Sequence, residues 1–152
     1  MNSACAVLKK YGPLIARILL AQLFVVSGLG KVMAFSKTAA FMAASGLPMS
    51  RVLLVLTLAL ELGGGALLIL GWKARWVAAA FFGFTLLSAL VFHQFWSAGP
   101  AHFTDQLNNF MKNLSIMGGM LYVMIYGAGP LALDRESAAT QEKGKHHAGK
   151  ER

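Results

Sequence analysis

The segment from Arg51 to Trp72 is apolar almost throughout, yet it carries one carboxylate, Glu61, near its middle. About 20 apolar residues in a helix are enough to cross the hydrocarbon core of a bilayer, because each residue adds roughly 1.5 Å. A charged side chain at that depth costs at least about 2.5–3.5 kcal/mol on insertion scales, and more without a partner. The segment therefore predicts a membrane-spanning helix whose carboxylate must be neutralised by another part of the chain.

Three glycines follow this carboxylate after a single leucine, and further glycines lie in other apolar runs. Gly63, Gly64 and Gly65 reduce one section of the helix surface to backbone, so that another helix can approach closely. Further glycines expected to serve close helix packing are Gly28, Gly118 and Gly119. These positions indicate where the helices come nearest to each other.

The composition of the whole chain excludes an ordinary soluble domain. Of its 152 residues, 57% are hydrophobic and 13% are charged, whereas soluble domains typically have about 45–50% and about 25%. Apolar runs long enough to span a bilayer occupy residues 13–34, 48–70, 74–96 and 110–133. We therefore predict an all-α fold, an integral membrane four-helix bundle that takes up residues 13–133.

The link between the first two runs is short and semi-apolar. It favours a brief helix lying in the membrane interface, which Ser45 and Gly46 would end and Pro48 would stop. An irregular loop with a few exposed apolar side chains is the alternative.

Lysine and arginine gather in the cytoplasmic loops of membrane proteins, which gives the chain an orientation. With the N-terminus inside, the inner side receives more basic residues than the outer side, among them Lys9, Lys10, Lys73 and Arg75. We predict a multi-pass protein of the bacterial inner (plasma) membrane with both termini cytoplasmic. Residues 1–12 form its N-terminus, and the polar stretch 134–152 has the composition of a disordered cytoplasmic tail.

Arg17 and Glu61 both fall well within predicted spans, and depth along the helices indicates whether they can meet. With a rise of roughly 1.5 Å per residue, Arg17 lies about 6 Å and Glu61 about 13 Å above the inner boundary. An arginine side chain spans that gap, so an intramembrane Arg17–Glu61 ion pair or proton relay is one hypothesis. The alternative is a protonated Glu61 bonded to a neighbour, with Arg17 reaching alone to the inner headgroups.

A second group of polar residues comes out near the outer boundary on three different helices. Its members are Lys31, His93, Lys112 and Asn113. Hydrogen-bond donors around an outward-facing cavity would bind an anion or a carbonyl oxygen, for example that of a quinone head group. The alternative is that the lysines anchor helix ends in the headgroup layer and that His93 caps a helix C-terminus.

The remaining chemistry that the residues allow is limited. Cys5 is the only cysteine, so the chain has no internal disulfide or CxxC motif, and redox chemistry would need a bound cofactor or a partner. The net charge of +8 is scattered over helix ends, which speaks against nucleic acid as a partner. His93, His102 and Asp105 have no diagnostic metal-binding spacing, so we predict no metal site.

A series of short motifs runs through the four predicted helices in order. The first helix contains Arg17, Phe24, Gly28 and Lys31, and Gly46-Leu47-Pro48 precedes the second. Later motifs are Glu61 with Gly64-Gly65 and Gly71, then His93, then Lys112-Asn113-Leu114 with Gly118-Gly119. Together they resemble the DoxX family of small bacterial membrane proteins, over about residues 13 to 133.

The resemblance implies a four-helix membrane protein from a family associated with quinone-linked thiosulfate oxidation or with membrane oxidoreductase complexes against oxidative stress. It favours a subunit or accessory of a membrane oxidoreductase or quinone-linked electron-transfer system. A quinone would then be the cofactor, and oxidoreductase subunits would be partners beside the lipid bilayer.

The alternative is a non-catalytic membrane scaffold or assembly protein. A small transporter ranks third, because four spans would require a homo-oligomer. Whether the chain is itself an enzyme stays open.

Overall fold

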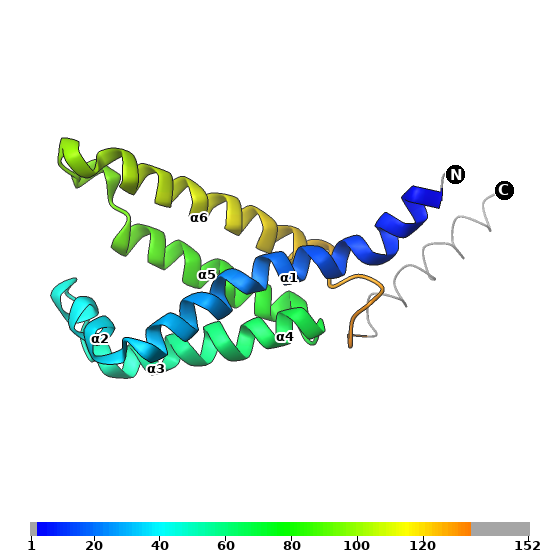
Figure 1. The fold of residues 1–152 in the computed structure, drawn as a ribbon, viewed down its shortest axis with the longest axis horizontal. Helices are drawn as coiled ribbons and strands as arrows, with labels where there is room; N and C mark the ends of the chain where they lie inside the picture. Colours follow the sequence, from blue (N-terminus) through cyan, green and yellow to red (C-terminus); the bar gives the residue numbers. More distant parts are fainter. Residues whose placement is uncertain (1–2, 135–152) are drawn as a thin grey trace.

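The computed structural model describes residues 3–134, and this part of the chain contains helices and no strands (Figure 1). The elements in order are α1 (Ser3–Met33), α2 (Phe35–Ala44), α3 (Ser50–Leu58), the π-helical turn η1 (Ala59–Gly64), α4 (Gly65–Leu70), α5 (Ala74–Phe92), the 3₁₀ turn η2 (Phe95–Ser97) and α6 (Pro100–Tyr126). Because α3, η1 and α4 follow one another without a break, they form one long helix.

Three helical segments within residues 3–134 are long and apolar enough to cross a membrane. They are α1, the continuous helix Ser50–Leu70, and Ala74–Ser97, which joins α5 to η2. The predicted all-α membrane fold is therefore confirmed. α6 is comparably long, with 27 residues, but its first turns are polar, so the fourth span stays a prediction.

Two helices begin well before the apolar runs that we used to predict their starts. α1 starts at Ser3 rather than at Pro13, and α6 starts at Pro100 rather than near Phe110. The helices start earlier than the predicted spans because apolarity marks only the part of a helix that suits hydrocarbon, and the span boundaries themselves stay predictions. Backbone hydrogen bonds continue into polar turns beyond it, and Pro100 suits the first turn of a helix, where its missing N–H costs nothing.

The short helix predicted between the first two runs is present as α2. It ends at Ala44, and Gly46 then adopts a left-handed conformation with φ of 82°. Its buried side chains Ala39 and Met42 pack with Leu54 of α3 in a small apolar cluster. α2 is therefore folded back against α3, while its position in the membrane interface stays a prediction.

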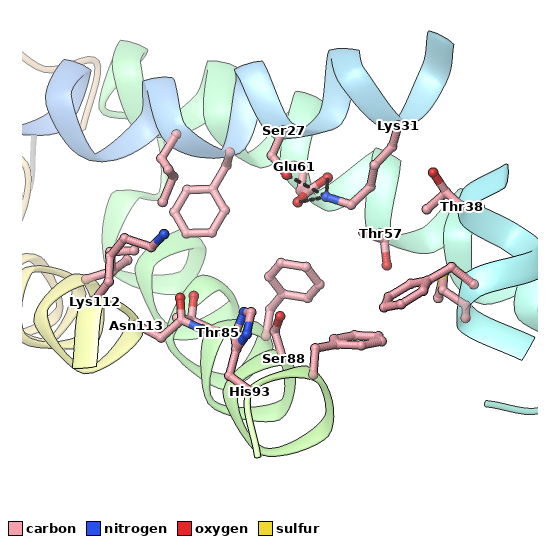
Figure 2. A pocket seen from close by; sticks show the side chains of 17 residues that line it. Ser27, Lys31, Thr38, Thr57, Glu61, Thr85, Ser88, His93, Lys112 and Asn113 are labelled. Carbon is pink, nitrogen blue, oxygen red and sulfur yellow. Dashed lines mark hydrogen bonds and ion pairs between the residues drawn. The ribbon is translucent and has the colours of Figure 1, made fainter. Parts of the chain in front are cut away.

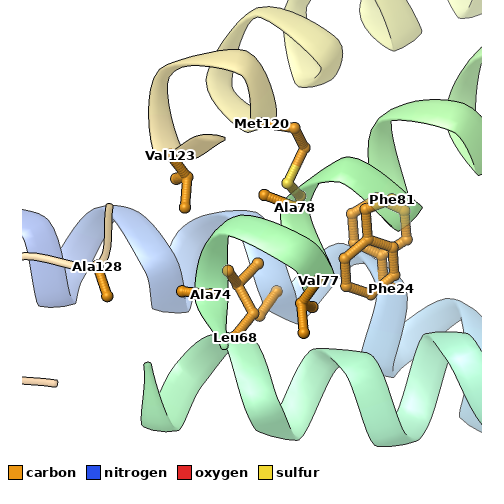
Figure 3. Close-up of a cluster of buried hydrophobic side chains, with 10 residues drawn as sticks. Phe24, Leu68, Ala74, Val77, Ala78, Phe81, Met120, Val123 and Ala128 are labelled. Atoms are coloured by element: carbon orange, nitrogen blue, oxygen red, sulfur yellow. The ribbon is translucent and has the colours of Figure 1, made fainter. Parts of the chain in front are cut away.

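The main core lies where α5 meets the other long helices (Figure 3). Phe24 of α1 stacks on Phe81 of α5, with 3.9 Å between ring centroids. Leu68 of α4 and Met120 of α6 are both completely buried in the same cluster. Every long helix thus contributes to one core, which fixes the helices that carry the polar residues relative to each other.

Four of the glycines predicted to serve helix packing do so. A methyl group added at Gly28 would lie 2.8 Å from Leu62, and at Gly65 it would lie 2.6 Å from Val25. The other two lie against large side chains as well, Gly64 against Phe81 and Gly119 against Leu20. Two predictions are wrong, because the described residues leave open space within 4 Å of the sites of such a methyl group at Gly63 and Gly118.

After α6 the chain folds back onto the turn between α4 and α5. The backbone N–H groups of Leu133 and Asp134 donate to the carbonyls of Leu70 and Gly71, at 3.1 and 2.9 Å. The Asp134 carboxylate accepts from the backbone N–H groups of Lys73 and Ala74, at 2.8 and 2.9 Å, and so caps α5. α6 therefore ends at Tyr126, not at residue 133. The predicted tail includes the ordered Asp134, and the rest of it, 135–152, lies outside the described residues.

Candidate functional site

Glu61 occupies the π-helical turn η1 and is only 2% exposed. In this turn the backbone bonds reach one residue further than in an α-helix, and such turns occur frequently at functional sites. The neighbouring α1 approaches closely because it carries Gly28 at this level. A Cβ atom added there would lie 3.2 Å from the Cβ of Glu61.

The partner of the buried carboxylate is Lys31 of α1. Its ammonium donates to both carboxylate oxygens of Glu61, at 2.7 and 2.9 Å, and to the hydroxyl of Ser27 at 2.6 Å. The Lys31 side chain keeps 26% of its surface exposed, whereas that of Glu61 is almost completely enclosed. Because both carboxylate oxygens accept hydrogen bonds from the cation, the desolvation cost of the pair is substantially offset.

The predicted Arg17–Glu61 ion pair is wrong. The Arg17 guanidinium donates to the backbone carbonyls of Leu68 and Ile69, at 3.3 and 2.9 Å. That contact places Arg17 level with the end of α4, eight residues beyond Glu61, or roughly 12 Å along a helix. The depth estimate failed because it placed Pro13 level with Leu70 as the inner ends of their helices, whereas Arg17 itself lies level with Leu68 and Ile69.

Arg17 instead joins three parts of the chain at the opposite end of the bundle. Besides the two carbonyls at the end of α4, it donates to the carbonyl of Leu131 in the segment that folds back after α6. The last carbonyls of a helix lack partners within it, so a buried cation satisfies them well. The alternative that Arg17 reaches alone to the headgroups is also wrong, because the residue is only 1% exposed.

The Glu61–Lys31 pair forms one wall of a cavity of about 310 Å³ (Figure 2). His93, Lys112 and Asn113 line the opposite wall, where their side chains face the pair across the cavity. All four residues of the predicted outer cluster thus meet at one site, and Glu61 belongs to the same site. The separation into an inner pair and an outer cluster is therefore wrong. That the cavity binds a ligand stays a prediction.

The wall opposite the Glu61–Lys31 pair has few hydrogen bonds to other residues in the described part of the chain. His93 Nδ1 and the Gln106 amide oxygen share a hydrogen bond of 3.1 Å, and Lys112 donates to Asn109 Oδ1 at 2.8 Å. Thr85 is 3% exposed, and its hydroxyl has no hydrogen-bond partner among residues 3–134. An unpaired buried hydroxyl costs free energy, so a partner supplied from the cavity would stabilise the site.

The remaining walls of the cavity are apolar and aromatic. Phenylalanines contributed by three helices line it, namely Phe24, Phe41, Phe84 and Phe92. Of these, Phe41 of α2 stacks on Phe92 of α5, with 5.6 Å between centroids. The cavity therefore offers flat apolar surfaces together with a small number of hydrogen-bonding groups, which is typical of small-molecule sites.

Sequence reasoning missed the hydroxyl groups of the cavity. Ser27, Thr57, Thr85 and Ser88 all line it, and Gln106 supports His93 from α6. Their spacing carried a signal, since Ser27 precedes Lys31 by one helical turn and Thr57 precedes Glu61 by one turn. Each charged residue of the pair thus has a hydroxyl on its own helix face.

The family model of DoxX matches residues 12–94 of the chain, which is more than half of it. The chain belongs to the DoxX family. The match covers Lys31, Glu61, Thr85 and His93, whereas the α6 side of the cavity, with Lys112 and Asn113, lies beyond it.

This DoxX-family chain is also similar to two named proteins of Escherichia coli strain K12. It is 39% identical over 130 residues to "Inner membrane protein YqjF", a stretch that covers 84% of this chain and 93% of that protein. It is 34% identical over 122 residues to "Inner membrane protein YphA", covering 80% and 87%. Together with its three apolar helices, these relatives identify the chain as a bacterial inner-membrane protein. No solved structure matches it.

Proposed function

We propose that this protein binds a quinone head group in the cavity between Glu61–Lys31 and His93–Asn113, as a membrane subunit or accessory of an oxidoreductase system. The proposal includes four membrane spans with both termini cytoplasmic. The observation that carries it is the cavity itself, in which donors and an acceptor from α1, η1, α5 and α6 surround a space of about 310 Å³. A quinone link is also what the DoxX resemblance implies.

The charges around the cavity favour a neutral ligand over an inorganic anion. The positive charge of Lys31 is already matched by the carboxylate of Glu61 at 2.7 Å. A second carboxylate or a phosphate placed there would be repelled by Glu61 and would have to be attracted by Lys112 and His93 alone. A quinone carries no net charge, and its carbonyl oxygens accept hydrogen bonds from ammonium, amide and hydroxyl groups.

The aromatic walls favour a flat ring. Phe24 is held by its stacking on Phe81, and Phe41 by its stacking on Phe92. Aromatic side chains held in this way attract a planar ring in offset or edge-on arrangements, at about 0.5–1.5 kcal/mol per pair beyond area burial.

Because the chain has a single cysteine and no second thiol, the electrons for a quinone would come from a partner protein.

A scaffold role remains as a second candidate, because Glu61 is neutralised within the chain. The pair with Lys31 fixes α1 against η1 without any ligand, as a structural ion pair does. The two candidates differ at Thr85, whose unpaired buried hydroxyl brings nothing to a scaffold but is useful to a ligand.

The test is to measure binding of a radiolabelled benzoquinone to the full-length protein in lipid nanodiscs, together with the quinone extracted from the protein purified from native membranes. Thr85→Val should weaken binding by up to about tenfold, because a hydrogen bond contributes about 0.5–1.5 kcal/mol. It should not lower thermal stability, since the hydroxyl that it removes has no hydrogen-bond partner in the part of the chain that the structure describes.

The matched control is Thr104→Val, the same exchange at an exposed position that does not line the cavity. Binding to this variant should equal that of the wild type. A wild-type protein that binds no quinone, and that carries none from native membranes, would contradict the proposal and favour the scaffold.

A further inference from the structure

A second, more open cavity of about 570 Å³ lies between α1 and α6. It is lined mainly by apolar side chains of α1, among them Leu19, Leu20 and Val26, with Ile116 facing them from α6. We refer to it as the α1–α6 groove. Its outer residues face away from the protein, since Leu19 is 58% and Val26 68% exposed. In a chain that spans the bilayer, this groove opens sideways into lipid.

The groove and the polar cavity adjoin each other. Four residues line both of them, and these are Leu23, Ser27, Lys112 and Ile116. The shared residues form the boundary at which the polar cavity passes into the apolar groove. Ser27 belongs to the hydrogen-bonded group of Lys31 and Glu61, and Lys112 faces the cavity from α6. A molecule placed in the cavity therefore has an apolar path to the membrane past Ser27 and Lys112.

The size of the polar cavity requires such a path for any ligand with a long chain. Small-molecule sites measure about 300–1,000 Å³, and this cavity, at about 310 Å³, is at the lower limit. It has room for a compact head group but not for a long hydrocarbon chain as well. A lipid-like ligand whose head occupied the cavity would have to place its chain in the adjoining space.

We infer that the ligand is an amphipath with one hydrocarbon chain, which enters from the bilayer and leaves its chain in the α1–α6 groove while its oxygen-bearing head occupies the polar cavity. The inference rests on the proposed function for the identity of the head. It adds the class of ligand, the direction of entry and the residues that select for a chain. Quinones with a side chain and protonated fatty acids, both of which have an uncharged head, share this chemistry, and the test separates them.

The experiment uses Val26→Trp, which fills the groove from a position that does not line the polar cavity. Binding to the full chain in nanodiscs is measured for a labelled benzoquinone without a side chain, for the same benzoquinone with a decyl chain, and for a long-chain fatty acid. Leu29→Trp is the matched control, because Leu29 is similarly exposed on α1 and lines neither cavity.

The expected result is that Val26→Trp weakens binding of the decyl quinone by about tenfold, because the indole ring occupies space that the chain would fill. Binding of the chainless quinone should stay the same, and Leu29→Trp should change neither. If Val26→Trp leaves decyl quinone binding unchanged, or weakens both quinones equally, the groove does not hold the chain and only the quinone proposal stands.

Failure of the proposed function can be distinguished from failure of the inference about the groove. If neither quinone binds to the wild type, the proposed function fails, and the fatty acid then decides the inference. Weaker fatty-acid binding to Val26→Trp, with normal binding to Leu29→Trp, would support the groove with a protonated carboxylic acid as the head. Fatty-acid binding that is absent, or equal in the two variants, would overturn the inference.

Discussion

Glu61 is almost completely buried, and its carboxylate accepts two hydrogen bonds from the ammonium of Lys31. Taking a carboxylate out of water costs several kcal/mol, and in this site the cost is offset by a cation held at 2.7 Å. Removing one partner of such a pair is more harmful than removing both, because a single deletion leaves an uncompensated buried charge.

We therefore predict that Lys31→Met lowers the free energy of unfolding by about 3–5 kcal/mol, whereas Lys31→Met combined with Glu61→Leu is close to neutral. The measurement is equilibrium unfolding of the purified protein in detergent, for both single variants and the double variant. Lys37→Met on the exposed face of α2 is the control and should have little effect. Additive effects of the two single exchanges would contradict the pairing.

At the scale of elements, the long helix Ser50–Leu70 meets α1 through glycines on one face only. Gly65 lies against Val25 of α1, and Gly28 of α1 lies against Leu62 in return. Gly63, two residues away from Gly65, has open space around its Cβ position. Two glycines in the same short stretch thus have opposite requirements, because one faces a helix and the other faces away from it.

We predict that Gly65→Ala destabilises the protein while Gly63→Ala does not. A Cβ atom at position 65 would lie 2.6 Å from Val25 Cγ2, so α1 must shift or lose contacts, at about 1–3 kcal/mol. At position 63 alanine has no clash and gains up to about 1 kcal/mol of helix propensity. Thermal unfolding of the two variants compares them directly, and an equal loss in both would contradict the packing.

The candidate site could be predicted in part because ionisable groups stand out in apolar helices. Counting residues placed Lys31, His93 and Lys112 near one level, and all three line one cavity. Thr85 could not be found in this way, because a threonine in a membrane helix usually bonds to its own backbone and so gives no signal. The partner of Glu61 was missed because a boundary inferred from Pro13 set the depth of Arg17.

Across the whole molecule, the two ends of the bundle carry different polar groups. One end holds the cavity between α1, η1, α5 and α6, which His93 lines directly after the end of α5. At the other end, Arg17 and Asp134 attach the segment after α6 to the turn between α4 and α5. If α6 crosses the membrane, these two ends face opposite sides of it.

The single cysteine offers a direct test of this arrangement. Cys5 is free and exposed in the first turns of α1, so with the proposed cytoplasmic N-terminus a membrane-impermeant maleimide should label it in inverted vesicles but not in intact spheroplasts. Two further variants are made in a Cys5→Ser background. His102 is exposed, and His102→Cys should be labelled in spheroplasts only. Ala132→Cys should be labelled from the same side as Cys5, in inverted vesicles. Labelling of positions 102 and 132 from one side would show that α6 does not cross.

The π-helical turn Ala59–Gly64 also sets the rotational phase of the helix that contains it. Its backbone bonds span one residue more than those of an α-helix, and one residue corresponds to about 100° around the axis. Wound as a regular α-helix, the same residues would turn the two halves of the helix against each other by about 100°. Either Glu61 would lose Lys31, or the carbonyls of Leu68 and Ile69 would turn away from Arg17. The extra residue therefore lets one continuous helix hold Glu61 toward Lys31 and the carbonyls of Leu68 and Ile69 toward Arg17.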